Sequence, residues 1–420
     1  MHHHFDSFNL LANEQFGFRK DLSTESATHA LLHTVLQSLD SKKLVGGLFC
    51  DIQKAFDCVD HEIHLSKLEF YGVTGVALKL MRTYIKNRYQ RVVIRDNLHN
   101  KVSSQWVSVD HGVPQGSVLG PFLFLVYIND FPQTINNVTN TILFADHTSI
   151  IISSDNAQDF EININRAIND SINWFFSNRL NLNCDKTNFI QFLTKNKNQI
   201  EPKIIASNTL ITNIMSTKFL GLFIDSTLSW KQHSTDLSNK LNKACYAIRA
   251  IKPYVTLNVL RMVYFSYFHA VMSYGIIFWG NSSSSIDIFR IQKRLIRIIT
   301  GKSRCDSCRD LFKQLQILTL PSQYIFSLLV FVVKNMALFQ FNSDIHDKNT
   351  RYNTNLHLPN TNLTLVQKGV LYSGSKIFNH LPIHIKTFTG DLKLFKSKLK
   401  TFLVDHSLYS LEEYYQTTSK

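Results

Sequence analysis

The spacing of apolar residues changes near residue 225, and this change limits the folds that the chain can adopt. Residues 1–224 mix short β-rich runs with helical spacing, which is typical of an α/β or α+β fold. From Trp230 onward the spacing is helical, and beyond about Asp344 it weakens until LKLFKSKLKTFLV. We therefore predict three domains, over residues 1–224, 225–343 and 344–420, the last a small helical extension.

Two predicted helices of the second domain carry basic faces. The first ends at Pro253, and the second runs from Asp287 to Thr300 and is stopped by Gly301. Their cations are Lys240, Lys243, Arg249 and Lys252 on the first helix and Arg290, Lys293, Arg294 and Arg297 on the second. Such faces are either solvated or part of a groove that follows phosphates, and the spacing leaves both interpretations open.

The whole chain is basic, with 45 Lys and Arg residues against 31 Asp and Glu residues and a net charge of +14. This excess suits a polyanionic partner such as nucleic acid, although a solvated basic surface is the alternative. The six cysteines are too scattered for a disulfide framework, so a reducing, intracellular compartment is expected.

Three further features are expected to be structural. Cys305 and Cys308 have metal-like spacing, but no second Cys/His pair follows at the distance that a zinc site requires. The apolar run Ile325–Val333 is too short to cross a membrane and predicts a buried helix. The histidines His2–His4 are expected to lie on a frayed terminus.

The segment LVGGLFCDIQKAFDCVDH places an acid at the end of a strand. The apolar residues Leu48, Phe49 and Cys50 predict a short buried strand that delivers Asp51 where a carboxylate can face solvent or a metal. A carboxylate at the end of a strand is common, so Asp51 indicates a metal site only together with a second acid.

The segment TILFADHTSI predicts a hairpin whose tip carries Asp146 and His147. Two acids on neighbouring strands can share divalent ions, which is the arrangement that two-metal phosphoryl transfer needs. A polar turn without a chemical role is the alternative for an Asp-His pair. Between the two acids, HGVPQGSVLG predicts a glycine-rich turn where the backbone can approach a ligand, with Gln115 as a hydrogen-bonding side chain.

Together these segments resemble the reverse transcriptase of non-LTR retrotransposons of the LINE-like, jockey type. The matching stretches span residues 13–225 in the family's order: NEQFGFRKDLSTESA, FCDIQKAFDCVDH, HGVPQGSVLGPFLF, FADH in place of an aromatic-Ala-Asp-Asp motif, LNLNCDKTNFIQF and KFLGLFID. The resemblance implies an α+β right-hand polymerase palm with partial fingers. An all-α thumb from near Trp230 and the C-terminal extension would follow.

The resemblance also implies RNA-directed DNA polymerisation by two-metal nucleotidyl transfer. It implies two Mg²⁺ ions as cofactors, with Mn²⁺ as an alternative, and an RNA template, a DNA primer or target and deoxynucleoside triphosphates as partners. The implied site residues are Asp51, Asp146 and His147 at the catalytic positions, the first two as metal ligands; Phe56, Gln115, Gly116 and Lys186 at the nucleotide; and Phe219, Leu220 and Gly221 at the primer end.

Two of these residues keep a structural alternative. The Phe56 ring would collide with a ribose 2′-hydroxyl and so select deoxynucleotides, or it would pack in the core. Lys186 would offset charge near the leaving pyrophosphate, or it would be a solvated lysine.

The chain departs from the family's pattern at two places. His147 stands where the family has a third carboxylate, and imidazole is a poor ligand for Mg²⁺. We also expect the chain to begin after the fingers segment whose arginine holds the triphosphate, as an N-terminally truncated copy without the endonuclease of many relatives. We therefore expect an impaired polymerase, with a catalytically inactive nucleic-acid-binding remnant as the alternative. The family resemblance is compatible with the nucleus, and template choice and oligomeric state stay open.

Overall fold

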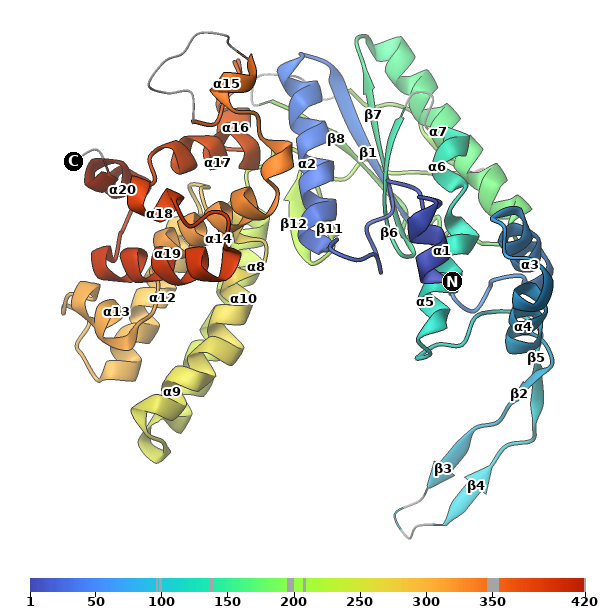
Figure 1. Ribbon diagram of the computed structural model, residues 1–420, viewed down its shortest axis with the longest axis horizontal. Coiled ribbons are helices and arrows are strands. Elements are labelled where there is room, and N and C mark those ends of the chain that lie inside the picture. Colours follow the sequence, from blue (N-terminus) through green and yellow to red (C-terminus); the bar gives the residue numbers. More distant parts are fainter. Residues whose placement is uncertain are drawn as a thin grey trace. The chain divides into compact units, whose positions relative to one another are not determined.

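The computed structural model describes residues 1–95, 97, 100–135, 139–194, 200–206, 209–345 and 355–418. These form two compact units, Met1–Leu220 and Gly221–Lys420, which we call unit 1 and unit 2. Unit 1 mixes helices and strands, whereas unit 2 is helical after its first strand (Figure 1). The α+β class predicted for the first part and the helical pattern predicted for the second are confirmed at this level.

The elements of unit 1 are, in chain order, α1 (His2–Ser7), α2 (Thr24–Asp40), β1 (Leu44–Asp51), α3 (His61–Phe70), α4 (Gly75–Ile85), β2 (Arg88–Gln90), β3 (Val93–Arg95), β4 (Lys101–Ser103), β5 (Val107–Val109), α5 (Leu119–Ile128), α6 (Phe131–Ile135), β6 (Thr139–Phe144), β7 (His147–Ser154), α7 (Ala157–Ser177), β8 (Asn188–Phe192), β9 (Ile205–Ala206), β10 (Thr209–Leu210) and β11 (Ser216–Phe219).

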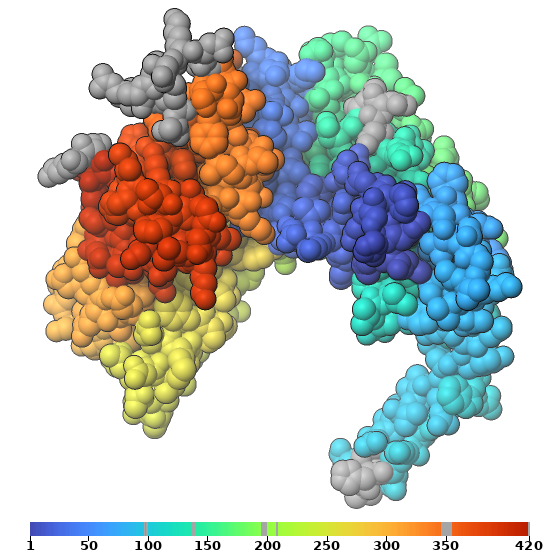
Figure 2. Space-filling view, in the orientation of Figure 1, coloured from blue at the N-terminus to red at the C-terminus, as the bar shows by residue number. Residues whose placement is uncertain are grey.

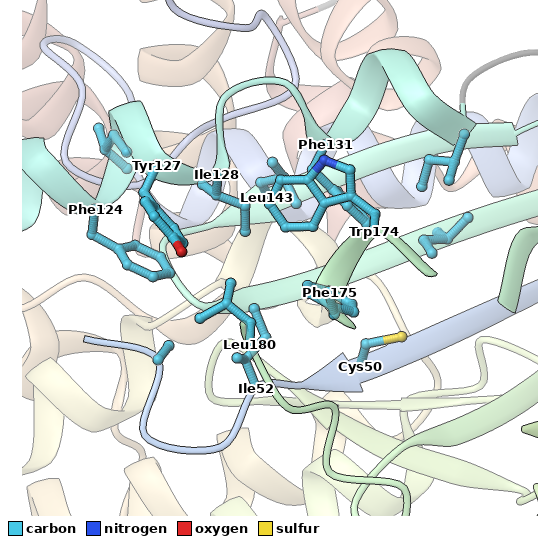
Figure 3. Packing of buried hydrophobic residues seen from close by; sticks show 14 of the residues in the cluster. Cys50, Ile52, Phe124, Tyr127, Ile128, Phe131, Leu143, Trp174, Phe175 and Leu180 are labelled. Carbon is cyan, nitrogen blue, oxygen red and sulfur yellow. The ribbon is translucent and has the colours of Figure 1, made fainter. Parts of the chain in front are cut away.

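The central sheet of unit 1 has four antiparallel strands in the order β6-β7-β1-β8. Because side chains alternate along a strand, Leu48 and Cys50 of β1 share one face with Ile150 of β7 and Phe189 of β8. This face belongs to one buried core with α5 and α7. Figure 3 shows Phe124 and Tyr127 of α5 and Trp174 and Phe175 of α7 around Cys50 and Ile52.

A two-stranded arm extends from unit 1 beyond α4. Strand β2 pairs with β5, and β3 pairs with β4 farther out (Figure 1). In Figure 2 the arm projects from the rest of unit 1. Both faces are open to solvent, so the apolar side chains of Tyr89, Ile94 and Trp106 are exposed. The guanidinium of Arg91 lies 4.7 Å from the centroid of the Trp106 ring.

The N-terminal residues are ordered, so the predicted fraying is wrong. Phe5 of α1 is fully buried and packs edge-on against Phe122, with 5.1 Å between ring centroids. His4 Nε2 lies within hydrogen-bond distance, 2.8 Å, of the Tyr71 carbonyl oxygen. The burial of Phe5 therefore attaches α1 to the core of unit 1.

The elements of unit 2 are β12 (Leu222–Asp225), α8 (Lys231–Ile251), the 3₁₀ turn η1 (Lys252–Tyr254), α9 (Leu257–Val263), the π-helical turn η2 (Tyr264–His269), α10 (Ala270–Ser273), α11 (Ile276–Trp279), α12 (Ser285–Thr300), α13 (Arg309–Leu315), α14 (Leu320–Lys334), η3 (Met336–Leu338), α15 (Asn342–Ile345), α16 (Thr364–Gln367), α17 (Val370–Asn379), α18 (Ile383–Lys386), α19 (Leu392–His406) and α20 (Leu411–Thr418).

The helices that periodicity predicted in unit 2 are confirmed. Helix α8 ends at Ile251, just before Pro253, and α12 ends at Thr300, where Gly301 adopts φ 74°. Gln292 of α12 is fully buried and satisfied: its amide donates to the Tyr264 hydroxyl and accepts from the Leu320 amide. Helices α17 and α19, from the C-terminal stretch, pack on α14. The division at residue 344 stays a prediction.

The apolar run Ile325–Val333 forms part of α14, and most of it is buried against neighbouring helices. Among the described residues, no single helix combines the length and the apolar character that a membrane crossing requires; α13 and α14 reach them only as a pair bent by 53°.

Candidate active site

Asp51 is the last residue of β1, and its side chain points away from the core. Its neighbours Cys50 and Ile52 are buried in the cluster of Figure 3, so the alternation of the strand places Asp51 on the opposite face. Burial raises the pKa of the Cys50 thiol to about 12, with Cys184 adding to the shift. Cys50 is therefore a neutral core residue.

The second acid lies on the neighbouring hairpin. Strands β6 and β7 pair from Thr139 with Ile152 to Phe144 with His147, which leaves Ala145 and Asp146 as the turn. In the register of β1 with β7, Asp51 lies directly opposite His147. The structure therefore brings Asp51, Asp146 and His147 to one end of the sheet, with His147 exposed and Asp146 half-buried.

The segment around Gln15 fixes this turn. Gln15 is buried, and its Oε1 accepts from the amide of Gly17 at 2.8 Å and from that of Ala145 at 3.1 Å. A Cβ on Gly17 would lie 2.5 Å from the Ala145 nitrogen, so glycine is required there. Ala145 itself has φ 55°, an uncommon conformation for a residue with a side chain. The position of Asp146 thus depends on a residue far away in the sequence.

Lys186 reaches the first acid. The loop before β8 is tied to the end of β1, because the Asn183 amide donates to the Asp51 carbonyl and the Gln53 amide donates to the Asn181 carbonyl. Lys186 Nζ lies 3.4 Å from Asp51 Oδ2 in an ion pair, with the lysine side chain 71% exposed and the aspartate 29% exposed. An accessible ammonium therefore stands beside the carboxylate.

The glycine-rich turn is joined to the segment that follows Asp51. Gly112 has φ 87°, and a Cβ there would lie 2.9 Å from the Asp57 backbone. Gln115 Nε2 donates to Asp57 Oδ1 at 2.7 Å, so its amide has a fixed orientation on the surface. Gly116 has φ 78° and open space where a Cβ would be, which leaves its backbone accessible.

Phe56 is half-buried and stacks on Phe124, with 4.6 Å between ring centroids. The core-packing role is therefore present, and part of the ring still faces solvent. Phe219 of β11 is buried and contacts the Phe49 ring edge-on, with 6.0 Å between centroids. Leu220 and Gly221 follow with φ 42° and 90°, so this segment makes a tight turn at the boundary of unit 1.

The donor set is compatible with Mg²⁺ shared between protein and substrate. Asp51 and Asp146 offer carboxylate oxygens, the ligands that Mg²⁺ prefers, and such ions are commonly held by one or two carboxylates plus substrate phosphates. Among the described residues, no three His, Cys, Asp or Glu side chains are close enough together to hold a metal alone. Cys305 and Cys308 form no such group either, and one is exposed while the other is buried.

Gln15 is the residue that the sequence reasoning missed. Gln15 lies in the stretch NEQFGFR, and a polar residue in a loop has no periodicity from which a role can be predicted. Arg19 of the same stretch donates to the Ala12 carbonyl at 2.8 Å, which ties that guanidinium to its own loop.

Comparison with known proteins gives consistent relatives. The probable RNA-directed DNA polymerase from transposon X-element of Drosophila melanogaster is 28% identical over 307 residues, 70% of this chain and 32% of that protein. The probable RNA-directed DNA polymerase from transposon BS of the same species is 28% identical over 69% of this chain and 33% of that protein. The polymerase from its mobile element jockey is 25% identical over 72% of this chain and 33% of that protein. The chain thus spans about a third of these relatives' length.

Among solved structures, telomerase from Candida tropicalis matches with a TM-score of 0.37 and 11% identity, over 72% of this chain and 54% of that one. The family described as reverse transcriptase (RNA-dependent DNA polymerase) matches residues 1–224, which is more than half of the chain and contains both acids. The chain therefore belongs to the reverse transcriptase family and carries a reverse transcriptase domain homologous to those of jockey-type non-LTR retrotransposons.

Proposed function

We propose that this chain acts as an RNA-directed DNA polymerase whose activity is reduced by His147. The observation that carries the proposal is the register of β1 with β7, which sets Asp51 beside the turn that holds Asp146. The expected right-hand arrangement of palm, partial fingers and thumb, and the roles of the individual site residues, belong to this proposal.

Asp51 and Asp146 are the residues that would hold two Mg²⁺ ions together with the substrate phosphates. When bound, such ions activate the primer hydroxyl and stabilise the developing charge on the transferred phosphate. Lys186, at 3.4 Å from Asp51 Oδ2, would donate a proton to the leaving pyrophosphate or offset its charge. Gln115, oriented by Asp57, would position the incoming deoxynucleoside triphosphate above the open backbone of Gly116.

The partners of this reaction are an RNA template, a DNA primer and deoxynucleoside triphosphates. The net charge of +14 supports binding of the nucleic acids. The exposed arm of unit 1 offers a further contact, because it combines Arg88, Arg91, Arg95 and Lys101 with exposed aromatic rings on which bases can stack.

A second function, binding of nucleic acid without catalysis, is favoured by one observation. His147 replaces an acid at the position facing Asp51, and so the site has two carboxylates where the family has three. Both functions predict binding that weakens with salt, and only the first predicts primer extension.

The test is primer extension on an RNA template with a DNA primer, in Mg²⁺ and in Mn²⁺. We expect slow extension by the wild-type protein and none by Asp51→Asn. The matched control is Asp155→Asn, which removes an exposed carboxylate just beyond the opposite end of β7 and should extend like wild type. Extension that survives Asp51→Asn would overturn the assigned site. Salt-dependent template binding without any wild-type extension would establish the binding function instead.

A further inference from the structure

Unit 2 contains a pocket of about 350 Å³ that is half open to solvent and is lined mainly by lysine and arginine residues. It is lined by Arg249 of α8, by Arg294, Arg297 and Ile298 of α12, and by Lys302 and Arg304 of the segment that follows α12. Five of these six residues are cations and none is acidic. Three of the eight cations noted on the two helical faces, Arg249, Arg294 and Arg297, thus meet at this pocket.

The fold holds this site in place. Helices α8 and α12 pack side by side, and the Arg294 guanidinium donates to the Asn242 side chain of α8. The chain turns back after Gly301, where the Lys302 amide donates to the Arg297 carbonyl at 3.0 Å. Arg297 Nε donates to the Asp306 carbonyl at 2.9 Å, which fixes the segment that carries Arg304. The cations are therefore brought together by ordered backbone.

The neighbouring acids do not neutralise this cluster. Asp236 of α8 pairs with Lys240, and Asp287 of α12 pairs with Arg290, both away from the cavity. The Asp306 carboxylate accepts from the Ser303 amide at 2.8 Å and keeps its negative charge, so it offsets at most one of the five positive charges. The carboxyl ends of α8 and α12 each supply about half a negative charge, which is too little for five cations. A bound anion would relieve the remaining repulsion.

The charge density of the cavity indicates the class of anion. A backbone phosphodiester carries one negative charge, whereas a terminal phosphate carries about −1.5 to −2 at neutral pH. Guanidinium groups bind phosphate oxygens in a bidentate manner, and the cavity has the size of a small-ligand site. We propose that this pocket binds a compact polyphosphate of three linked phosphoryl groups, either free or as the 5′-triphosphate end of an RNA.

This inference does not depend on polymerase activity, and calorimetry without divalent ions tests it. Inorganic tripolyphosphate is titrated into the full chain and into Arg249→Gln/Arg304→Gln. Each lost charge-assisted contact should weaken binding about tenfold or more. The matched control is Lys240→Gln/Arg290→Gln, which removes two cations from α8 and α12 outside the cavity and should bind like wild type. Matching circular-dichroism melts of the variants show that all of them fold.

Two RNAs of identical sequence, one with a 5′-triphosphate and one with a 5′-hydroxyl, distinguish an RNA end from a free polyphosphate as the ligand. Tighter binding of the triphosphate RNA that the cavity variant abolishes would identify an RNA end as the ligand. Tripolyphosphate binding without preference between the RNAs, together with RNA binding that is unchanged in the cavity variant, would identify a free polyphosphate. Absence of tripolyphosphate binding, or equal loss of both RNAs in the cavity variant alone, would overturn the proposal. Asp51→Asn should bind tripolyphosphate like wild type. Primer extension therefore tests the polymerase proposal alone, and tripolyphosphate binding tests the pocket alone.

Discussion

Asp51 and His147 are direct cross-strand partners at the end of the antiparallel pair β1 and β7. Such partners have Cα atoms about 4.5–5.5 Å apart and side chains on the same face. The residue before Asp51 and the residue after His147, Cys50 and Thr148, are buried partners on the other face. A carboxylate at position 147, where this chain has histidine, would therefore face Asp51, for which we propose metal binding.

We expect His147→Asp to increase primer extension, because it restores a negative charge beside the metal positions. At an effective dielectric near 20, one charge pair at ~4 Å is worth about 4 kcal/mol, or roughly a thousandfold in rate. We expect a gain below this limit, since holding the triphosphate contributes to the barrier independently. The measurement is the extension rate against Mg²⁺ concentration, with a lower half-saturating concentration expected for the variant.

Two variants control this experiment. His384→Asp adds the same charge at an exposed histidine of α18 in unit 2 and should leave the rate unchanged. Adding Asp51→Ala to His147→Asp should abolish the gain. Equal rates for His147→Asp and His147→Asp/Asp51→Ala would show that the chemistry occurs elsewhere. Full activity of the wild-type protein in Mg²⁺ would contradict the view that His147 lowers the activity.

Gln15→Met should destabilise the turn that carries Asp146. The change leaves the buried amides of Gly17 and Ala145 without their shared acceptor, at a cost of about 1–3 kcal/mol. We expect a lower urea midpoint and faster hydrogen exchange over residues 143–149. Gln158→Met, at an exposed position in the first turn of α7, is the control and should change neither. Unaltered exchange in the Gln15 variant would show that the turn holds without this contact.

The sequence was informative where a local pattern determines structure. Helical spacing with Pro253 and Gly301 located the ends of α8 and α12, and the apolar runs located β1 and the β6–β7 hairpin. Contacts between distant segments could not be predicted this way. The hydrogen bonds of Gln15 to Ala145 and of Gln115 to Asp57 join loops, and no periodicity or spacing in the sequence predicts them. The short, exposed strands of the arm likewise lack the alternation that a buried face imposes.

Phe56→Ala should separate the two roles of this ring. Loss of stacking on Phe124 should lower stability by about 1 kcal/mol or more, as for other aromatic pairs. If Phe56 is also the gate, the variant should incorporate ribonucleotides that wild type excludes, in an extension assay with single nucleotides on the His147→Asp background. Tyr84→Ala is the control for aromatic loss elsewhere in unit 1. Reduced stability with unchanged sugar selection would assign Phe56 to packing alone.

His64 should make unit 1 sensitive to acid. It is fully buried, neither ring nitrogen has a hydrogen-bond partner among the described residues, and burial, followed by Lys67 and His61, lowers its pKa to about 3. In the unfolded chain the His64 imidazole is protonated near pH 6.5, whereas in the folded chain it stays neutral until about pH 3. The contribution of neutral His64 to the free energy of unfolding is therefore fully present above pH 6.5. Between pH 6.5 and pH 3 this contribution falls by at most about 1.4 kcal/mol per pH unit. His64→Leu should remove the part of this slope that His64 contributes.

The measurement is urea unfolding of wild type and His64→Leu at a series of pH values from 7.5 to 5. At pH 7.5 the two proteins differ only through packing beside the Tyr127 ring, whose centroid is 5.8 Å from that of His64. Below pH 6.5 the stability of the variant relative to wild type should rise steadily, because the other histidines whose pKa burial lowers, among them His29 and His233, are common to both. His384→Leu, at an exposed position, should follow the wild-type profile. Parallel profiles for wild type and His64→Leu would mean that His64 is protonated in the folded chain, with its charge accommodated by the groups around α3.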